Sequence, residues 1–305
     1  MTATFLASHA ERLRQTSWAR VTRTAWAILL IGLFTSMLLH TALPHVLRRL
    51  LLVAPLIPFV AKDLSHLPDA FARTRAALAA RDWLALGAAW LPPELVGLLR
   101  LDGQMRRGFV SWLLRRPQPA LPPGEAFSYL ERGSYSTVVA IALISTLVDL
   151  PLNGFIVQLF VKTAQPREVI HVLMAVACLS SLAWVLGDRW LVGKGQHVLD
   201  DDFLHLRVGA RTTGIIPRHA IDRCEPLTVT ANEWRRQHGI EPHRSLCASP
   251  LDKPNSVLIL NDNSPVRLTH MGVERTGLAC VFLYLDRPQA LASALRHPPG
   301  MDART

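Results

Sequence analysis

Asp149 is the residue of this sequence whose position most suggests chemistry. It lies near the middle of a long apolar stretch, residues 137–161. A carboxylate at the centre of a bilayer costs about 2.5–3.5 kcal/mol on insertion scales, so it should face the protein interior and be paired there. Arg48 and Arg49, in another apolar stretch, are the partners that we predict. Such a pair is either a proton or ion site or an internal staple between helices. We favour the staple, because a small helix bundle leaves little room for a pathway.

A second set of residues suits the surface of a membrane. Residues 104–116 mix Trp, Phe and Leu with arginines, which is typical of a helix lying in an anionic leaflet surface. Packing of the same helix on membrane helices or on a C-terminal domain explains the pattern equally well, because both need an amphipathic helix. The predicted membrane-surface residues are Arg106, Arg107, Trp112, Arg115 and Arg116.

Motifs for catalysis and metal binding are missing from the sequence. It contains no Gly-x-Ser-x-Gly, no P-loop and no His-Glu-x-x-His. The four cysteines have no paired spacing, and no second pair of ligands accompanies His238 and His243. We therefore predict no metal, no cofactor and no enzymatic activity.

The elements that must position these residues are long and apolar. Half of the 305 residues are hydrophobic, only 18% are charged, and the mean hydropathy is +0.23. This composition excludes a disordered chain and argues against an ordinary soluble enzyme, which would carry about 25% charged residues. A membrane-spanning helix needs about 20 mostly apolar residues, so we predict about four transmembrane helices. They lie at residues 25–40, 45–61, 137–161 and 169–192.

The basic residues predict the orientation of these spans. The formal net charge is +10, and the connection 62–133 and the region from 194 onward carry ten and fourteen Lys and Arg. The connection between the last two spans carries two. By the positive-inside rule we predict a multi-pass protein of the bacterial inner membrane, with both termini in the cytoplasm. Because insertion alone explains the positive charge, nucleic acid is not a predicted partner. A predicted partner is the lipid bilayer with its anionic inner leaflet.

From residue 194 onward the apolar runs shorten to strand length. Residues 203–208 alternate between apolar and polar, and further strands are expected at 212–217, 227–230, 256–260, 266–269 and 277–286. Residues 231–255 are polar and irregular, and 288–297 form a short helix. About seven strands and one helix predict a small β-barrel or sandwich. The predicted domains are a basic tail with the first hairpin (1–61), an amphipathic helical connection (62–133), a second hairpin (134–193) and a cytoplasmic β domain (194–305).

Several short motifs give this β domain a resemblance to a known family. They are Leu204-His205-Leu206-Arg207-Val208-Gly209, Ile216-Pro217 with Ile221, and Leu285-Asp286-Arg287-Pro288, together with Phe127-Ser128-Tyr129 ahead of the third span. The chain resembles uncharacterised bacterial multi-spanning membrane proteins with a C-terminal bacterial PH-like domain. The resemblance implies an all-β PH-like barrel closed by one helix, with a role in recognition. The turn Asp200-Asp201-Asp202 stands where eukaryotic PH domains carry basic residues, so it would repel an inositol phosphate.

Together these observations predict a membrane helical bundle with a cytoplasmic recognition domain. The expected function is non-enzymatic: the PH-like domain acts as an interaction or scaffold module for a protein partner that the sequence does not identify. The alternative is a small transporter or ion-coupled protein using Asp149. A third hypothesis is a membrane-embedded enzyme acting on lipid. Function argued from fold is an analogy, so these hypotheses stay open here.

Overall fold

The computed structural model describes Leu13, Thr16 and residues 18–39, 44–118, 120–160, 164–249, 251–261 and 265–296. The chain divides into two compact units, Met1–Val96 and Gly97–Thr305, and each is described by itself. The first is helical. The second combines long helices with two β-sheets, and the long helices precede most of the strands, as predicted.

The first unit consists of helices, three of which have a proline in their first turn. Proline fixes φ and has no N–H to lose, so it favours the first turn of a helix, and it lies there in η1, α4 and α5. Arg81, in the left-handed conformation, ends α5. The elements are α2 (Trp18–Leu38), α3 (His45–Val53), η1 (Ala54–Leu56), α4 (Ile57–Ser65), α5 (Leu67–Ala80) and α6 (Trp83–Ala88). Helix α7 (Pro93–Leu113) connects the two units.

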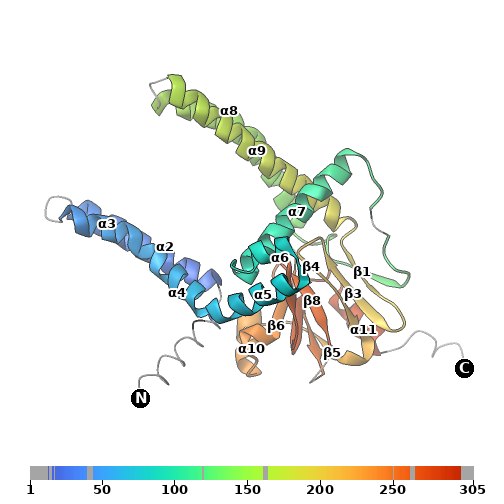
Figure 1. Cartoon of the computed structure of the whole chain (residues 1–305). Helices are drawn as coiled ribbons and strands as arrows, with labels where there is room; N and C mark the ends of the chain where they lie inside the picture. Colours follow the sequence, from blue (N-terminus) through green and yellow to red (C-terminus); the bar gives the residue numbers. More distant parts are fainter. Residues whose placement is uncertain are drawn as a thin grey trace, which may run out of the picture. The chain divides into compact units, whose positions relative to one another are not determined.

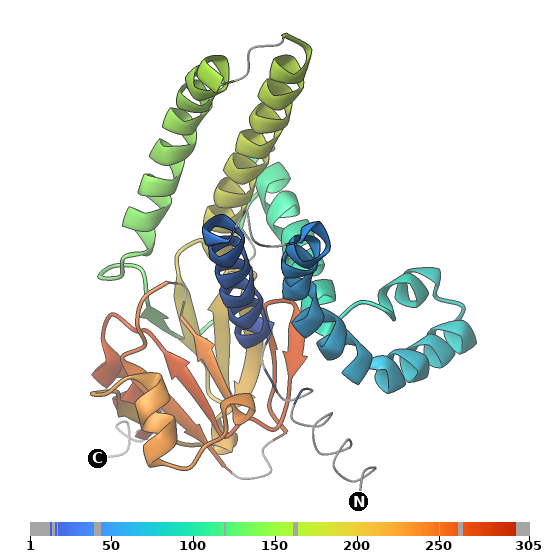
Figure 2. The same cartoon turned by 90° about the vertical axis from the view of Figure 1, so that its left-hand side faces the viewer.

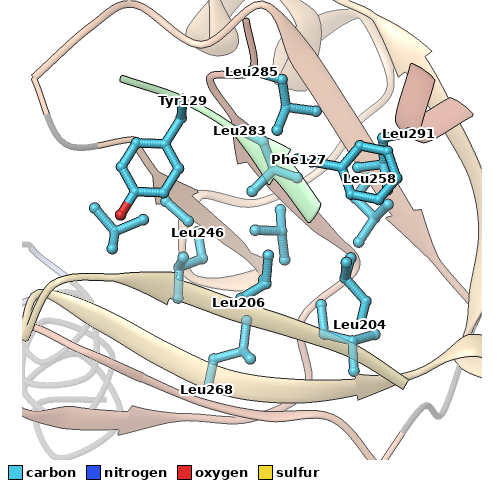
Figure 3. Close-up of a cluster of buried hydrophobic side chains, with 14 of the residues drawn as sticks. Phe127, Tyr129, Leu204, Leu206, Leu246, Leu258, Leu268, Leu283, Leu285 and Leu291 are labelled. Atoms are coloured by element: carbon cyan, nitrogen blue, oxygen red, sulfur yellow. The ribbon is translucent and has the colours of Figure 1, made fainter. Parts of the chain in front are cut away.

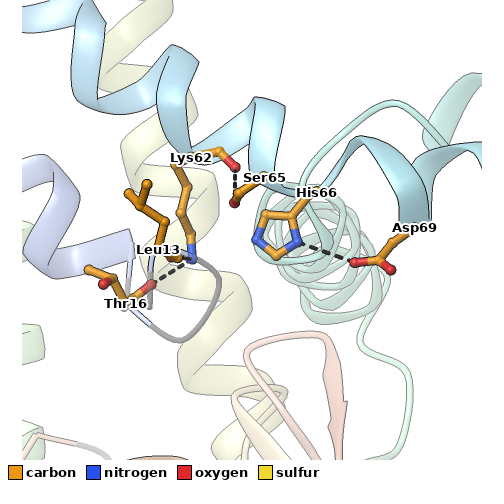
Figure 4. Close-up of polar contacts among 6 residues, drawn as sticks. All are labelled: Leu13, Thr16, Lys62, Ser65, His66 and Asp69. Atoms are coloured by element: carbon orange, nitrogen blue, oxygen red, sulfur yellow. Dashed lines mark hydrogen bonds and ion pairs between the residues drawn. The ribbon is translucent and has the colours of Figure 1, made fainter. Parts of the chain in front are cut away.

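A buried lysine ties the chain ahead of α2 to α4 (Figure 4). The side chain of Lys62 is 1% exposed, and its Nζ donates hydrogen bonds to the carbonyl oxygens of Leu13 at 2.8 Å and Thr16 at 2.6 Å. An ammonium group can be buried only if its donors are satisfied. Lys62 therefore fixes the backbone of Leu13 and Thr16 against α4.

Two helices in the described part of the chain are long and apolar enough to cross a membrane, over Tyr135–Leu159 and Arg167–Val192. A third candidate is the pair Arg49–Ser65 and Leu67–Ala80, if these two helices, bent by 53°, form one span. The two apolar helices of the second hairpin are thus present where the sequence predicts them. The predicted total of about four spans is not reached by the described residues and stays a prediction.

The second unit contains the helical hairpin of α8 (Tyr135–Phe160) and α9 (Ala164–Val192), which run side by side away from the β-sheets (Figures 1 and 2). The hairpin is inserted between two neighbouring strands. Strand β1 (Glu125–Ser128), ahead of α8, pairs antiparallel with β2 (Gln196–Leu199), which follows α9. The β domain therefore begins before the hairpin, and residues 194–305 alone leave out one of its strands.

The strands form two sheets. A six-stranded sheet has the order β1-β2-β3-β4-β8-β9, and a four-stranded sheet has the order β5-β7-β10-β6. All pairs are antiparallel except β10 and β6, which are parallel. The remaining bounds are β3 (Phe203–Val208), β4 (Thr212–Pro217), β5 (Ile221–Pro226), β6 (Ser245–Ala248), β7 (Ser256–Leu260), β8 (Arg267–His270), β9 (Val273–Arg275) and β10 (Cys280–Leu283), with helices α10 (Ala231–Gln237) and α11 (Pro288–Arg296).

The main core lies between the two sheets (Figure 3). Alternate residues of β3 are buried there, Leu204 and Leu206 among them, as the predicted alternation requires. Facing side chains such as Leu258 and Leu283 come from the four-stranded sheet, and Leu291 comes from α11. Each of these leucines contributes about 1.5–3 kcal/mol by burial, so this cluster is the main source of the domain's stability.

The predicted barrel closed by one helix is wrong, because the sheets do not close. β4 and β5 are consecutive, yet η2 (Arg218–Ala220) separates them and they belong to different sheets. In the described chain, none of the edge strands β1, β9, β5 and β6 pairs with an edge of the other sheet. Alternation marks which side of a strand is buried, and that side is the same in a barrel and in a sandwich. The sequence pattern therefore could not decide closure.

Helix α7 packs against α9 through facing small residues. Gly108 of α7 and Gly187 of α9 lie at the contact, and a Cβ on Gly187 would be 1.9 Å from the carbonyl oxygen of Met105. Leu101 and Met105 are buried against Trp184 and neighbouring apolar residues. Of the two explanations for the amphipathic connection, packing on a helix of the second hairpin, α9, therefore holds for this face of α7.

We expect the Gly187→Ala variant to lose about 1–3 kcal/mol of stability, because the added methyl group forces α7 and α9 apart. Gly103→Ala is the matched control: nothing lies within 4 Å of a Cβ at this position of α7, so it should be neutral or stabilising by up to about 1 kcal/mol. Thermal unfolding of the full chain in detergent compares the two. Equal midpoints would show that the helices do not approach as closely as described.

Candidate functional site

The hairpin joins the β domain through a buried polar cluster that we call the hairpin junction: Tyr135, Asp188 and Arg211. The Tyr135 hydroxyl and the Arg211 guanidinium each donate a hydrogen bond to Oδ2 of Asp188, both at 2.9 Å. The side chains of Asp188 and Arg211 are 4% and 15% exposed, and Tyr135 is completely buried. Three elements thus meet at one carboxylate.

Each member of the hairpin junction lies at or near the end of a helix or in a turn between strands. Tyr135 is the first residue of α8, Asp188 lies in the last turns of α9, and Arg211 is in the tight turn between β3 and β4. The Arg211 guanidinium carbon also lies 5.8 Å from the ring centroid of Trp184, one turn before Asp188 on α9. A desolvated pair held this way resists separation, because parting it would leave a charge buried without a partner.

The start of α8 is held by two carboxylates of the β domain. Asp286 accepts hydrogen bonds from the backbone N–H groups of Glu131 and Arg132, both at 2.9 Å. Asp252 accepts from the N–H of Ser134 at 2.8 Å and from its hydroxyl at 2.6 Å. Ser134 directly precedes α8, where N–H groups have no intrahelical partner and carboxylates interact favourably with the helix dipole. Glu131 and Arg132 lie in the bend ahead of it.

The end of α9 is held by donors to its last carbonyl groups. Gln118 donates to the carbonyl oxygen of Trp190 at 3.1 Å, and Arg207 of β3 donates to that of Leu191 at 3.3 Å. Arg189 donates to Gly193 at 2.9 Å. These carbonyls would otherwise be unpaired at the helix terminus. Both ends of the hairpin are therefore bonded to the β domain.

A buried histidine lies beside this attachment. His197 of β2 is completely buried, its ring centroid is 4.9 Å from that of Tyr129, and its Nδ1 accepts a hydrogen bond from the N–H of Arg207 at 3.2 Å. Its proton is therefore on Nε2. Burial lowers the pKa of His197 to about 4 and raises the pKa of Tyr129 above its ordinary value. His197 is neutral near pH 7.

A groove of about 770 Å³ lies on the other side of the β domain, beside α10. Trp234 of α10 packs edge-on against Phe282 at 5.6 Å, on the face of the four-stranded sheet opposite the main core. The groove runs between α10 and β6, which is the edge strand of that sheet. Its lining includes Arg235, Cys247 and Lys253. The backbone at this edge is available to a further strand.

The predicted intramembrane pair divides between the two units. Asp149 lies on α8 with an exposed side chain, so α9 does not cover it. Arg49 is exposed on α3 in the first unit, and the side chain of Arg48 lies outside the described residues. Because each unit is described by itself, the pairing of Asp149 with these arginines stays a prediction.

The predicted membrane-surface residues lie on or just after α7, all with exposed side chains. Arg106 donates hydrogen bonds to Asp102 at 2.7 Å and to Ser180 of α9 at 3.3 Å, so it faces the hairpin. Trp112 is 45% exposed and stacks on Phe109, with centroids 5.9 Å apart. The others are Arg107, Arg115 and Arg116. Contact of these residues with a bilayer stays a prediction.

Sequence reasoning did not identify the hairpin junction. The available signal was Asp188, a carboxylate within the fourth apolar stretch, but Asp149 drew attention because it is closer to the centre of a span. The partner Arg211 lies in a turn of the β domain, and only the fold brings it to α9. Among the described residues, no group of three or more His, Cys, Asp or Glu could hold a metal ion.

The hairpin junction can fix an orientation, and the groove can accept a ligand. Comparison with known proteins adds no assignment: no family model, no curated protein and no solved structure matches this chain. The resemblance to a bacterial PH-like domain is therefore untested. What this chain does must be inferred from its own geometry.

Proposed function

We propose that this chain is a non-enzymatic, multi-pass protein of the bacterial inner membrane that presents a PH-like β domain to a protein partner on the cytoplasmic side. The observation that carries the proposal is the hairpin junction. A recognition domain on a flexible linker needs no buried ion pair with its anchor. Here the Asp188–Arg211 pair and the Tyr135 hydrogen bond hold the domain to α8 and α9.

A fixed orientation favours recognition at a defined position above the bilayer. Preorganisation of this kind lowers the ordering entropy that association costs. The positive-inside pattern supports the cytoplasmic placement of the domain and of both termini, with about four spans. We favour this function over ion transport, because the side chain of Asp149 on α8 is exposed and α9 does not cover it.

The groove beside α10 is the surface where we propose that the partner binds. β6 is an edge strand, so an extended segment of a partner protein can add to the four-stranded sheet by backbone hydrogen bonds. Side chains of that segment would enter the groove next to Phe282 and Cys247. The charged residues of the lining are Arg235, Lys253 and Glu233, so its net charge is positive. A positive lining favours a segment with acidic side chains.

Site-specific photo-crosslinking in intact bacterial membranes tests this function. A crosslinker at Asn232, in the groove, should capture one defined protein, and a crosslinker at the exposed Glu274 of β9 should not. Cys247→Trp fills the groove and should abolish the product. Ile215→Trp, at a residue 50% exposed on the other sheet, should leave it unchanged. Capture that is identical from both positions, or insensitive to Cys247→Trp, would refute the proposal.

A further inference from the structure

A polar cavity of about 370 Å³ lies where α9 ends and the β domain begins. Its walls come from the chain after α7 (Gln118, Ala120 and Leu121), the segment from Val192 to Gln196, and Arg207 of β3. It is separate from the groove beside α10, and no residue lines both. Neither the hairpin junction nor the proposed partner surface explains it.

The lining of this cavity suits an anion. It includes the cations Lys194 and Arg207 and the amides of Gln118 and Gln196, and no carboxylate. Lys194 is exposed and makes no ion pair within the described chain. Arg207 uses one nitrogen for the carbonyl oxygen of Leu191 and keeps other N–H donors. Cations that present several donors bind phosphate oxygens by charge-assisted hydrogen bonds.

The negative end of the α9 dipole would oppose an anion here, but its carbonyl groups are occupied. Those of Trp190, Leu191 and Gly193 accept hydrogen bonds from Gln118, Arg207 and Arg189. Two of these donors are cationic and neutralise the terminus. The loop that follows is compact, since Gly195 has a φ of +63° and a Cβ there would be 2.1 Å from Cγ of Leu130.

The depth of the cavity points to its ligand. Val192 is the last residue of the candidate span Arg167–Val192, so the cavity opens at the level where the hydrocarbon of a bilayer gives way to lipid phosphates. Exposed residues lead to it from the end of α7, among them Trp112, Arg115 and Arg116. Trp and Arg are the residues that anchor a protein at this level of an anionic leaflet.

We propose that Lys194 and Arg207 form a binding site for the phosphate group of an anionic phospholipid. The same chemistry would accept free inorganic phosphate, and the location favours the lipid. The bound phosphate would bridge the end of α9 and β3, which stabilises the folded chain in proportion to its occupancy. This site is distinct from the acidic turn Asp200–Asp202, which would repel such a group.

Thermal unfolding of the full chain in detergent micelles tests the site. The midpoint is measured against increasing short-chain phosphatidylglycerol, the zwitterionic phosphatidylcholine of the same chain length, and inorganic phosphate. We expect a saturable rise with phosphatidylglycerol and none with phosphatidylcholine. Lys194→Gln should weaken the apparent affinity at least about tenfold, as expected for the loss of one charge-assisted hydrogen bond. Lys194→Arg should retain it, and Arg236→Gln, which removes an exposed charge of α10 that lines neither the cavity nor the groove, should not change it.

The outcomes separate the two sources of phosphate. A rise with phosphatidylglycerol alone that depends on Lys194 supports a lipid site. An equal, Lys194-dependent rise with inorganic phosphate supports the same site with free phosphate as ligand. No rise with either compound, or a rise that Lys194→Gln and Arg236→Gln affect equally, overturns the proposal.

Discussion

We expect the Arg211→Met variant to have a free energy of unfolding about 3–5 kcal/mol lower than the wild-type chain, the usual cost of leaving a buried charge without its partner. The side chain of Asp188 is 4% exposed, and methionine fills much of the space of arginine without supplying a donor. For a unit of this size the loss corresponds to a melting midpoint lower by about 10 °C, measured on the full chain in detergent.

Two comparisons identify the cause of that loss. Adding Asp188→Asn to Arg211→Met removes the stranded charge and keeps an acceptor for the Tyr135 hydroxyl, so the double variant should be more stable than Arg211→Met alone. Arg223→Met removes an arginine that pairs with Asp222 and Glu225 at the surface and is 55% exposed. It should cost less than about 1 kcal/mol. A double variant no more stable than Arg211→Met would contradict the pairing.

The second large effect is a loss of stability in acid caused by His197. Burial holds its pKa at about 4 in the folded chain, against an ordinary value of 6.5. Between these values the unfolded chain binds a proton that the folded chain does not, so stability is complete above pH 6.5 and falls as the pH drops toward 4. The total for this fully buried group is about 3 kcal/mol.

His197→Asn tests this effect, because an asparagine oxygen can accept the hydrogen bond from the N–H of Arg207 and does not titrate. Its stability should fall less steeply between about pH 6.5 and pH 4 than that of the wild type, whatever its stability near pH 7. Burial also lowers the pKa of His270, which is present in both proteins and cancels in the comparison. Parallel curves of melting midpoint against pH would exclude His197 as the cause.

Local patterns predicted much of the fold. The alternation at residues 203–208 and the apolar run 256–260 correspond to β3 and β7, and the apolar stretches 137–161 and 169–192 correspond to α8 and α9 within a few residues. These patterns predict the elements because each alternating strand has one apolar face and each of the two long helices is apolar over its whole surface. The final helix, predicted at 288–297, is α11.

Features that depend on distant pairing were not predictable in the same way. Residues 231–255 look irregular in sequence, yet they contain α10 and β6. Helix α10 has a single large apolar residue, Trp234, and β6 is defined by its parallel pairing with β10, more than thirty residues later. The hairpin junction also depends on residues that are distant in the sequence, since no local pattern links Asp188 to Arg211. The resemblance implied a closed barrel, and the periodicity of the strands could not test that closure, so the predicted barrel was wrong.

The insertion of the hairpin between β1 and β2 constrains the topology of the chain by parity. Neighbouring strands of one sheet lie on one side of a bilayer, so Ser128 and Gln196 must lie on the same side. The chain between them therefore crosses an even number of times, whatever the lipid or the charge of the loops. Strand β1 cannot pair with β2 until both helices have been synthesised. The sheet is completed only if α9 brings the chain back to the side on which β1 lies. Pairing of β1 with β2 is thus compatible with both helices crossing a membrane or with neither crossing it, and it excludes a chain in which only one of them crosses.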